Sequence, residues 1–261
     1  MTTQTSFAET RKPLLEASGL PAWCYYDRDF YNREMQGIFH KGWILVGRLD
    51  EVPKPGDYVV ADLGGASVIM VRDDAQVVHV VANACSHRGT PLAEGRGTTR
   101  AFRCPYHSWT FGLDGTLRGA GGMEQAVGFT LADWPLLPVR HETWGGFVFA
   151  TLSDETRSLH DWLGNLPERL EMYGFSNMVT TRHIEYDVAC NWKLWVENFM
   201  EGYHIATVHT RTLSGQKVVN IPEDPGPGEV VWIYEQHEGT RALLRGDTGF
   251  PPIETLHGDS A

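Results

Sequence analysis

Cys85-Ser-His-Arg-Gly89 and Cys104-Pro-Tyr-His107 are the two stretches that decide the fold of this chain. Each supplies one thiol and one imidazole, and sixteen residues separate the two pairs. Glycine and proline favour tight turns, so Gly89 and Pro105 place each pair on a loop. Four potential ligands of two kinds on neighbouring loops predict a metal centre.

This ligand set is typical of a mixed [2Fe–2S] cluster. Two thiolates hold one iron and two imidazoles hold the other, which gives a higher reduction potential than four cysteines give. A zinc site is the competing interpretation, but the short Cys-x-His bite differs from the half-sites that tetrahedral zinc prefers. We therefore predict a cluster whose ligands are Cys85, His87, Cys104 and His107.

Short β-rich runs surround the two loops, and turn residues separate them. The predicted strands are Trp43–Val46, Tyr58–Asp62, Ser67–Arg72, Val77–Ala82, Trp109–Phe111, Thr116–Leu117 and Phe147–Leu152. Together they predict a small all-β module. Apolar residues at helical spacing precede it at 27–40, and mixed elements follow it. The latter are helices at 159–173 and 191–204 and a strand at 183–188.

A second candidate site lies in Asn191-Trp-Lys-Leu-Trp-Val-Glu-Asn-Phe-Met-Glu-Gly-Tyr-His204, which His209 follows. On a helix, Asn198, Glu201 and His204 are three residues apart and share one face. Two histidines with one carboxylate form the facial triad of non-haem Fe(II) oxygenases. Taken alone this is a weak signal, because the chain has 11 histidines and ordinary polar residues on a helix surface would explain it.

With both sites considered together, the chain resembles the α subunits of Rieske non-haem iron oxygenases. The two ligand loops, continued through Cys104–Gly115, are similar to that family's, and so is the segment from Asn191 to His209. Respiratory Rieske proteins carry an extra cysteine in each loop, whereas this chain has Thr90 and Tyr106 near those positions. The loops therefore resemble the disulfide-free type.

The resemblance implies roles for the second site. His204 and His209 would bind the mononuclear iron, and Asn198 would lie beside these ligands. Glu201 would join His204 to a cluster histidine of a neighbouring subunit. Many members of the family have aspartate where this chain has Glu201, and glutamate is shared with the branch of choline- and carnitine-type monooxygenases.

The family's third iron ligand is an aspartate far downstream, and only 261 − 209 = 52 residues follow His209. The acids available there stand in no matching context; they are Asp224, Asp247, Glu254 and Asp259. We therefore expect an incomplete catalytic domain. The predicted fold is α+β: an N-terminal helical segment (1–42) that packs on the catalytic domain, an all-β Rieske domain (43–155), and the first part of a helix-grip-like catalytic domain (156–261).

The function implied is that of the oxygenase component of a multicomponent system. It would use O₂, and electrons from a separate NAD(P)H-dependent reductase, directly or through a ferredoxin, to mono- or dioxygenate a small aromatic or amine substrate. Because the two metal sites of one subunit are far apart in this family, a homotrimer or α3β3 assembly is implied. Two alternatives stay open: a Rieske electron-transfer protein, and a paralogue that lacks the third iron ligand.

Composition excludes other classes. Acidic residues outnumber basic ones, 33 to 22, and a net charge of −11 disfavours nucleic acid as a partner. No apolar run approaches the roughly 20 residues that span a bilayer, and no secretory signal opens the chain, so we expect a cytoplasmic protein with no membrane partner. Neither a G-x-G-x-x-G nor a P-loop sequence is present.

Overall fold

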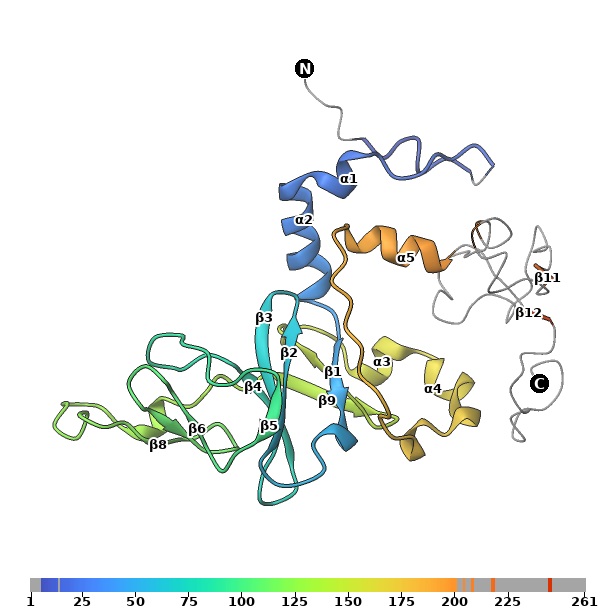
Figure 1. Cartoon of the computed structure of the whole chain (residues 1–261). Helices are drawn as coiled ribbons and strands as arrows, with labels where there is room; N and C mark the ends of the chain where they lie inside the picture. Colours follow the sequence, from blue (N-terminus) through green and yellow to red (C-terminus); the bar gives the residue numbers. More distant parts are fainter. Residues whose placement is uncertain are drawn as a thin grey trace. The chain divides into compact units, whose positions relative to one another are not determined.

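The computed structural model describes residues 6–13, 15–200, 204, 208, 217–218 and 244–245 (Figure 1). The chain divides into two compact units. The first combines Met1–Asn32, Glu168–Tyr173 and Glu185–Ala261, and the second combines Arg33–Pro167 and Gly174–Ile184.

Three antiparallel sheets form the second unit. A four-stranded sheet has the order β4-β3-β2-β5, with β2 at Asp57–Leu63, β3 at Ala66–Arg72, β4 at Val78–Ala82 and β5 at Arg96–Thr98. A three-stranded sheet, β1-β10-β9, comprises Ile44–Arg48, Phe147–Thr151 and Arg140–Trp144. A smaller sheet, β6-β7-β8, comprises Phe102–Arg103, Thr110–Phe111 and Leu117–Gly119.

Strand β3 contributes to two hydrophobic cores. Side chains along a strand alternate between its faces, and in β3 both faces are buried. Ile69 and Val71 join the core that also contains Cys85 and Cys104. Val68 and Met70 join a second core with side chains of β1, β2, β4 and β10. This central strand thus ties the ligand loops to the rest of the unit.

The helices are short. Two α-helices and a π-helix precede the sheets: α1 at Trp23–Tyr26, α2 at Arg28–Glu34 and η1 at Met35–Phe39. Later come α3 at Leu159–Leu163, α4 at Leu166–Arg169 and α5 at Trp192–Met200. Single 3₁₀ turns lie at Leu49–Glu51 (η2), Leu131–Asp133 (η3), Glu171–Tyr173 (η4) and Phe175–Asn177 (η5). Within the described residues, no helix combines the length and apolar character that crossing a bilayer requires.

All seven predicted strands of the β module are found, within one or two residues at their ends. Three more were missed, β5, β6 and β9, because their short or mixed sequences carry no clear alternation. The single helix predicted at 159–173 is wrong. Gly164 adopts a positive φ of 58° and ends α3, and α4 begins two residues later.

The strand predicted at 183–188 is also wrong. These residues are exposed and belong to no helix or strand. Their alternating pattern has no neighbouring strand to pair with among the described residues, and a lone extended segment does not form a sheet. The helix predicted at 191–204 is described as α5 up to Met200, and the short strands β11 (Lys217–Val218) and β12 (Leu244–Arg245) pair further on.

Candidate metal centre

The first ligand loop is a compact turn that begins at Cys85. The backbone N–H of Cys85 donates to the Thr90 carbonyl at 2.9 Å, and the N–H of Gly89 donates to the Cys85 carbonyl at 2.7 Å. Gly89 has φ +70°, a conformation that glycine adopts without the steric cost of a side chain. The turn closes on itself and leaves the N–H groups of His87 and Arg88 directed at the Cys85 sulfur.

The second loop repeats this turn. The N–H of Cys104 donates to the Trp109 carbonyl at 2.8 Å, and the N–H of Ser108 donates to the Cys104 carbonyl at 2.9 Å. Ser108 takes the place of the glycine, with φ +61°. The N–H groups of Tyr106 and His107 donate to the Cys104 sulfur. The two loops thus present their cysteines in the same backbone setting.

The two thiols are buried and touch each other. Cys85 is 3% exposed and Cys104 is 2% exposed, and a hydrogen bond joins them. Burial raises the pKa of Cys85, and the neighbouring Cys104 raises it further. Burial also opposes ionisation of Cys104, but the N–H groups directed at its sulfur, with the Thr90 hydroxyl, hold its pKa below the ordinary value. Such donors are suited to a metal-bound thiolate.

The two imidazoles lie together on the outer side of the thiols. The Nδ1 atoms of His87 and His107 are 3.1 Å apart. His87 is half-buried and stacks on Trp109, with ring centroids 4.8 Å apart and an interplanar angle of 15°. His107 is exposed and stacks under Tyr106 at 3.8 Å. Burial, His107 and Arg88 all lower the pKa of His87, which favours the neutral, metal-binding form.

These donors fit a binuclear cluster better than a single ion. Within the described part of the chain, no three His, Cys, Asp or Glu residues converge as ligands of one metal ion. The four side chains instead form a sulfur pair and a nitrogen pair. In a [2Fe–2S] cluster of this kind, the sulfur pair binds one iron and the nitrogen pair binds the other. Two imidazole nitrogens at about 2.1 Å from one tetrahedral metal lie roughly 3.4 Å apart, near the observed 3.1 Å.

Hydrophobic side chains form the inner wall of the site. The core around the two cysteines includes Phe102, Trp109, Phe111, Leu113, Leu117 and Leu136. Trp109 meets Phe129 and Trp134 edge to face, at 5.7 and 5.8 Å. The Ser86 hydroxyl donates to the Trp134 carbonyl at 2.8 Å, which ties the first loop to this aromatic group. A dry wall of this kind keeps water from the sulfur side of a cluster.

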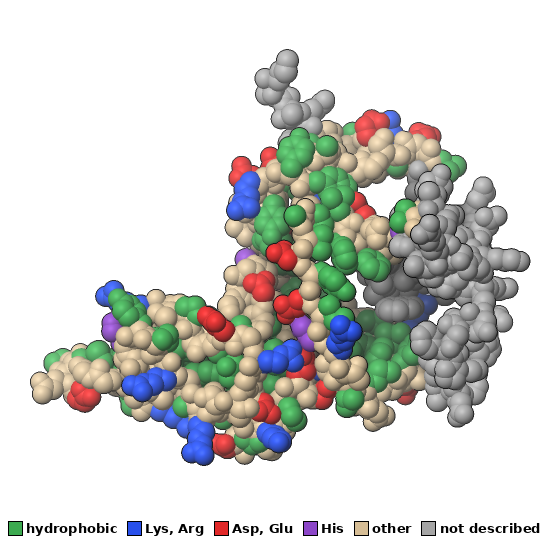
Figure 2. Space-filling view, in the orientation of Figure 1, with side chains coloured by type: hydrophobic (Ala, Val, Ile, Leu, Met, Phe, Trp, Pro, Cys, Tyr) green, Lys and Arg blue, Asp and Glu red, His purple; other side chains and the backbone are tan. Residues whose placement is uncertain are grey.

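The surface near the loops is locally basic. Residues 84–120 contain five arginines and two acidic residues, 5 − 2 = +3, although the whole chain carries −11. All five are exposed: Arg88, Arg96, Arg100, Arg103 and Arg118. Figure 2 shows Lys and Arg side chains on the part of this face that β5 and β6 occupy. Arg103 donates to Ser108 Oγ at 3.0 Å, and Arg88 adjoins His87, so this charge reaches the exposed edge of the site.

The predicted residues of the second site are only partly described. Asn198 is exposed on α5, and His204 is half-buried four residues after that helix ends. Glu201 and His209 lie outside the described residues, as do Asp224, Asp247, Glu254 and Asp259. The structure therefore brings together the four cluster residues and leaves the mononuclear site as a prediction.

Sequence reasoning missed several residues that shape the first site. Thr90 was noted only for not being cysteine, yet its hydroxyl donates to the Cys104 sulfur across the two loops. Ser108 carries the strained conformation of the second loop. A signal was present: Gly89 and Ser108 each stand four residues after a cysteine, the spacing at which both turns require a positive φ.

Comparison with known proteins now places the chain in a class. Residues 42–135 match the Rieske [2Fe-2S] domain, and residues 175–254 match the catalytic domain of ring-hydroxylating alpha subunits. The cofactors of these two domains are a [2Fe–2S] cluster and non-haem Fe(II). The chain thus joins a Rieske domain to sequence of a ring-hydroxylating catalytic domain.

Within these matches, the chain is homologous to choline monooxygenase and to the glycine betaine monooxygenase oxygenase subunit. It is 34% identical over 215 residues to choline monooxygenase of Arabidopsis thaliana, covering 78% of this chain and 51% of the relative. It is 34% identical over 195 residues to the glycine betaine monooxygenase oxygenase subunit of Pseudomonas aeruginosa, covering 74% and 45%. The chain spans about half the length of the curated relatives it matches.

Solved structures of Rieske oxygenases are similar to this chain. A quaternary ammonium Rieske monooxygenase in complex with L-carnitine matches with a TM-score of 0.73 and 29% identity, over 78% of this chain and 59% of that one. Naphthalene 1,2-dioxygenase from Rhodococcus sp. matches with a TM-score of 0.64 and 30% identity, over 79% and 48%. The predicted family resemblance and the predicted α+β fold are therefore confirmed.

Proposed function

We propose that this chain is the oxygenase component, or part of it, of a Rieske oxygenase that hydroxylates a small organic substrate. The observation that carries the proposal is the pairing of two buried thiols with two outward imidazoles in one Rieske domain. The match of residues 175–254 to a ring-hydroxylating catalytic domain supports the oxygen chemistry. The cluster residues without the catalytic-domain match would support only an electron-transfer protein.

In this proposal, Cys85 and Cys104 hold the inner iron, and His87 and His107 hold the outer iron. The bound cluster supplies single electrons at a potential above that of an all-cysteine cluster. The loop N–H groups donate to both sulfurs and would stabilise them as metal-bound thiolates, and Trp109 would keep the His87 ring in place. His107, at the exposed edge, is the ligand that a neighbouring protein can reach.

His204 and His209 are proposed as ligands of the mononuclear Fe(II), with Asn198 beside them. Glu201 is proposed to accept one hydrogen bond from His204 and one from the partner subunit's His107, which would orient both rings. This role requires an oligomer, and we propose a homotrimer or an α3β3 assembly. Inter-subunit electron transfer is known for a solved quaternary ammonium Rieske monooxygenase, which supports this arrangement.

The proposed substrate is a small quaternary amine, and the proposed reaction is its monooxygenation. The curated relatives are named for choline and glycine betaine, and solved relatives for carnitine and γ-butyrobetaine. Aromatic hydrocarbons are the second candidate, since naphthalene dioxygenase also matches. The electrons would come from an NAD(P)H-dependent reductase, directly or through a ferredoxin. The basic surface around the loops suits an acidic face on that donor.

Counting irons tests the proposal. The chain is reconstituted anaerobically with iron and sulfide, and its iron content is compared with the absorbance of the cluster. Three irons per chain support an oxygenase, whereas two support an electron-transfer protein or a catalytically incomplete paralogue. In Glu201→Ala we expect the visible spectrum of the cluster to persist while hydroxylation of choline, glycine betaine or carnitine is lost. Normal turnover in that variant would refute the bridging role.

A further inference from the structure

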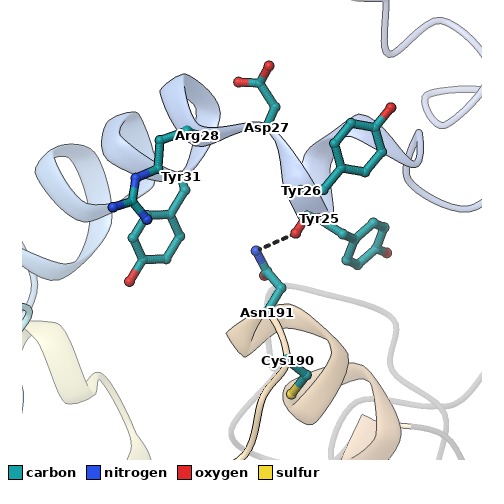
Figure 3. Close-up of a pocket in the computed structure, with 7 residues that line it drawn as sticks. All are labelled: Tyr25, Tyr26, Asp27, Arg28, Tyr31, Cys190 and Asn191. Carbon is teal, nitrogen blue, oxygen red and sulfur yellow. Dashed lines mark hydrogen bonds between the residues drawn. The ribbon is translucent and has the colours of Figure 1, made fainter.

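A polar anchor fastens α5 to the N-terminal helix α1 within the first unit. The Tyr25 hydroxyl lies 2.8 and 3.0 Å from the two carboxylate oxygens of Glu197, to which it donates. The Asn191 amide donates to the backbone carbonyl of Tyr25 at 3.2 Å, a contact drawn in Figure 3. Asn191 also accepts the backbone N–H of Lys193 at 3.1 Å. One residue of α1 therefore contacts α5 at its start and again near its second turn.

A buried cation completes this anchor. Lys193 is 7% exposed, and its ammonium lies over the rings of Tyr25, Phe30 and Trp192 at 5.6, 5.3 and 5.3 Å. Removing a charge from water is costly, so a lysine is retained at such a position only where its surroundings compensate. Aromatic faces do so through cation–π attraction. The same tyrosine thus meets Lys193 with its ring and Glu197 with its hydroxyl.

Apolar packing alone would not require this arrangement. Apolar contacts tolerate sliding and rotation of a helix, whereas hydrogen bonds and ring-to-cation contacts fix its rotation and register. The anchor lies on the helix that leads to His204, four residues beyond its last turn. The pKa of Tyr25 is raised to about 12 by burial and by Glu197, so its hydroxyl remains a donor at neutral pH.

We propose that Tyr25, Lys193 and Glu197 are positioning residues that fix α5 so that the mononuclear iron ligands converge. This inference rests on the proposed function, because it assumes an iron bound by His204. It also assigns Glu197: the Tyr25 hydroxyl contacts both of its carboxylate oxygens, so this acid serves the anchor and is not the third iron ligand. The Asn-Trp-Lys sequence at the start of α5 thereby acquires a role, since Asn191 accepts a hydrogen bond from the Lys193 N–H and Lys193 packs against the ring of Tyr25.

Tyr25→Phe is the main test, with Tyr26→Phe as the matched control. Tyr26 neighbours Tyr25 on α1 but is 75% exposed. The chain with its cluster in place is titrated anaerobically with Fe(II), and with Co(II) as a spectroscopic probe. We expect about a tenfold loss of metal affinity and an altered Co(II) spectrum in Tyr25→Phe, as for other residues that support metal ligands. The cluster spectrum and the Tyr26→Phe variant should be unchanged. Equal Fe(II) affinity in the two variants would overturn the inference.

Two substitutions at Glu197 separate positioning from simple packing. Glu197→Gln keeps an oxygen that accepts from Tyr25 and should retain the metal affinity, while Glu197→Leu keeps bulk without an acceptor and should lose it. If both bind Fe(II) like the parent chain, the anchor has no positioning role.

Amide hydrogen exchange over 192–200 tests the anchor without reference to iron. Exchange should accelerate in Tyr25→Phe and Glu197→Leu but not in Tyr26→Phe or Glu197→Gln. A parent chain that binds no third iron would refute the proposed function. Unchanged exchange in Tyr25→Phe would refute the anchor itself, whatever the iron count.

Discussion

The two ligand loops have the same type of backbone turn but differ in the exposure of their histidines. In both, the cysteine N–H donates five residues ahead, and the residue at the fourth position donates back to the cysteine carbonyl. His87 stands two residues after its cysteine, is half-buried and stacks on a buried tryptophan. His107 stands three residues after its cysteine and is exposed beneath Tyr106.

This difference separates two properties of the site. The shared turn sets the N–H donors that face each cysteine sulfur, because these donors are backbone groups. The spacing from cysteine to histidine sets the exposure of each imidazole, since one additional residue along a turn carries the side chain to a different side. His87 is thereby held by the buried Trp109, whereas His107 is exposed and accessible to another protein.

The largest expected effect comes from removing either thiol. Cys85→Ser and Cys104→Ser should each abolish the cluster, because the hydroxyl of serine is a poor ligand for iron in a site that requires thiolates. The visible absorption of the reconstituted protein measures this loss. Cys190→Ser is the control, since Cys190 is exposed and lies outside the loops. A cluster of normal spectrum in either loop variant would refute the assigned ligands.

Replacing an imidazole should change the reduction potential rather than the presence of the cluster. His87→Cys and His107→Cys each add a negative charge to the outer iron, so we expect the potential to fall by at least about 100 mV toward the all-cysteine range. Protein-film voltammetry measures the shift. An unchanged potential in a cluster-bearing His107→Cys variant would contradict ligation by the exposed histidine.

The positive-φ positions should respond in opposite directions. Gly89→Ala introduces a Cβ that meets no atom within 4 Å, so its cost is backbone strain of about 1 kcal/mol. Ser108→Gly relieves similar strain but loses the Arg103 hydrogen bond, so a smaller gain of about 0.5 kcal/mol is expected. Scanning calorimetry should show the melting temperature lowered in the first variant and slightly raised in the second. The same sign in both would show that the turns are not equivalent.

The smallest effect concerns the hydrogen bond that crosses between the loops. Thr90→Val removes the hydroxyl that donates to the Cys104 sulfur. Hydrogen bonds to cluster sulfurs favour the reduced form, so the potential should fall, by less than in the histidine variants. Thr98→Val, on β5, is the control. If the two variants have the same reduction potential, Thr90 contributes only packing.

The sequence by itself determined the ligand set of the cluster and most of the β module. Cys85, His87, Cys104 and His107 were identifiable because tight loops keep their ligands close in sequence, so chain order carries the spatial information. The strands around them were identifiable because each has one or both faces buried, which imposes a local pattern of apolar residues. The resemblance to Rieske oxygenases rests on the same short segments.

Only the tertiary structure decided which side chains surround those segments. The stacking of His87 on Trp109 brings together residues 22 positions apart, 109 − 87, and the bond from Tyr25 to Glu197 spans 172. No local pattern encodes such contacts, because they arise when separate elements pack. The wrong strand at 183–188 has the same cause: alternation is a local property, whereas a strand requires a partner that the chain must supply from elsewhere.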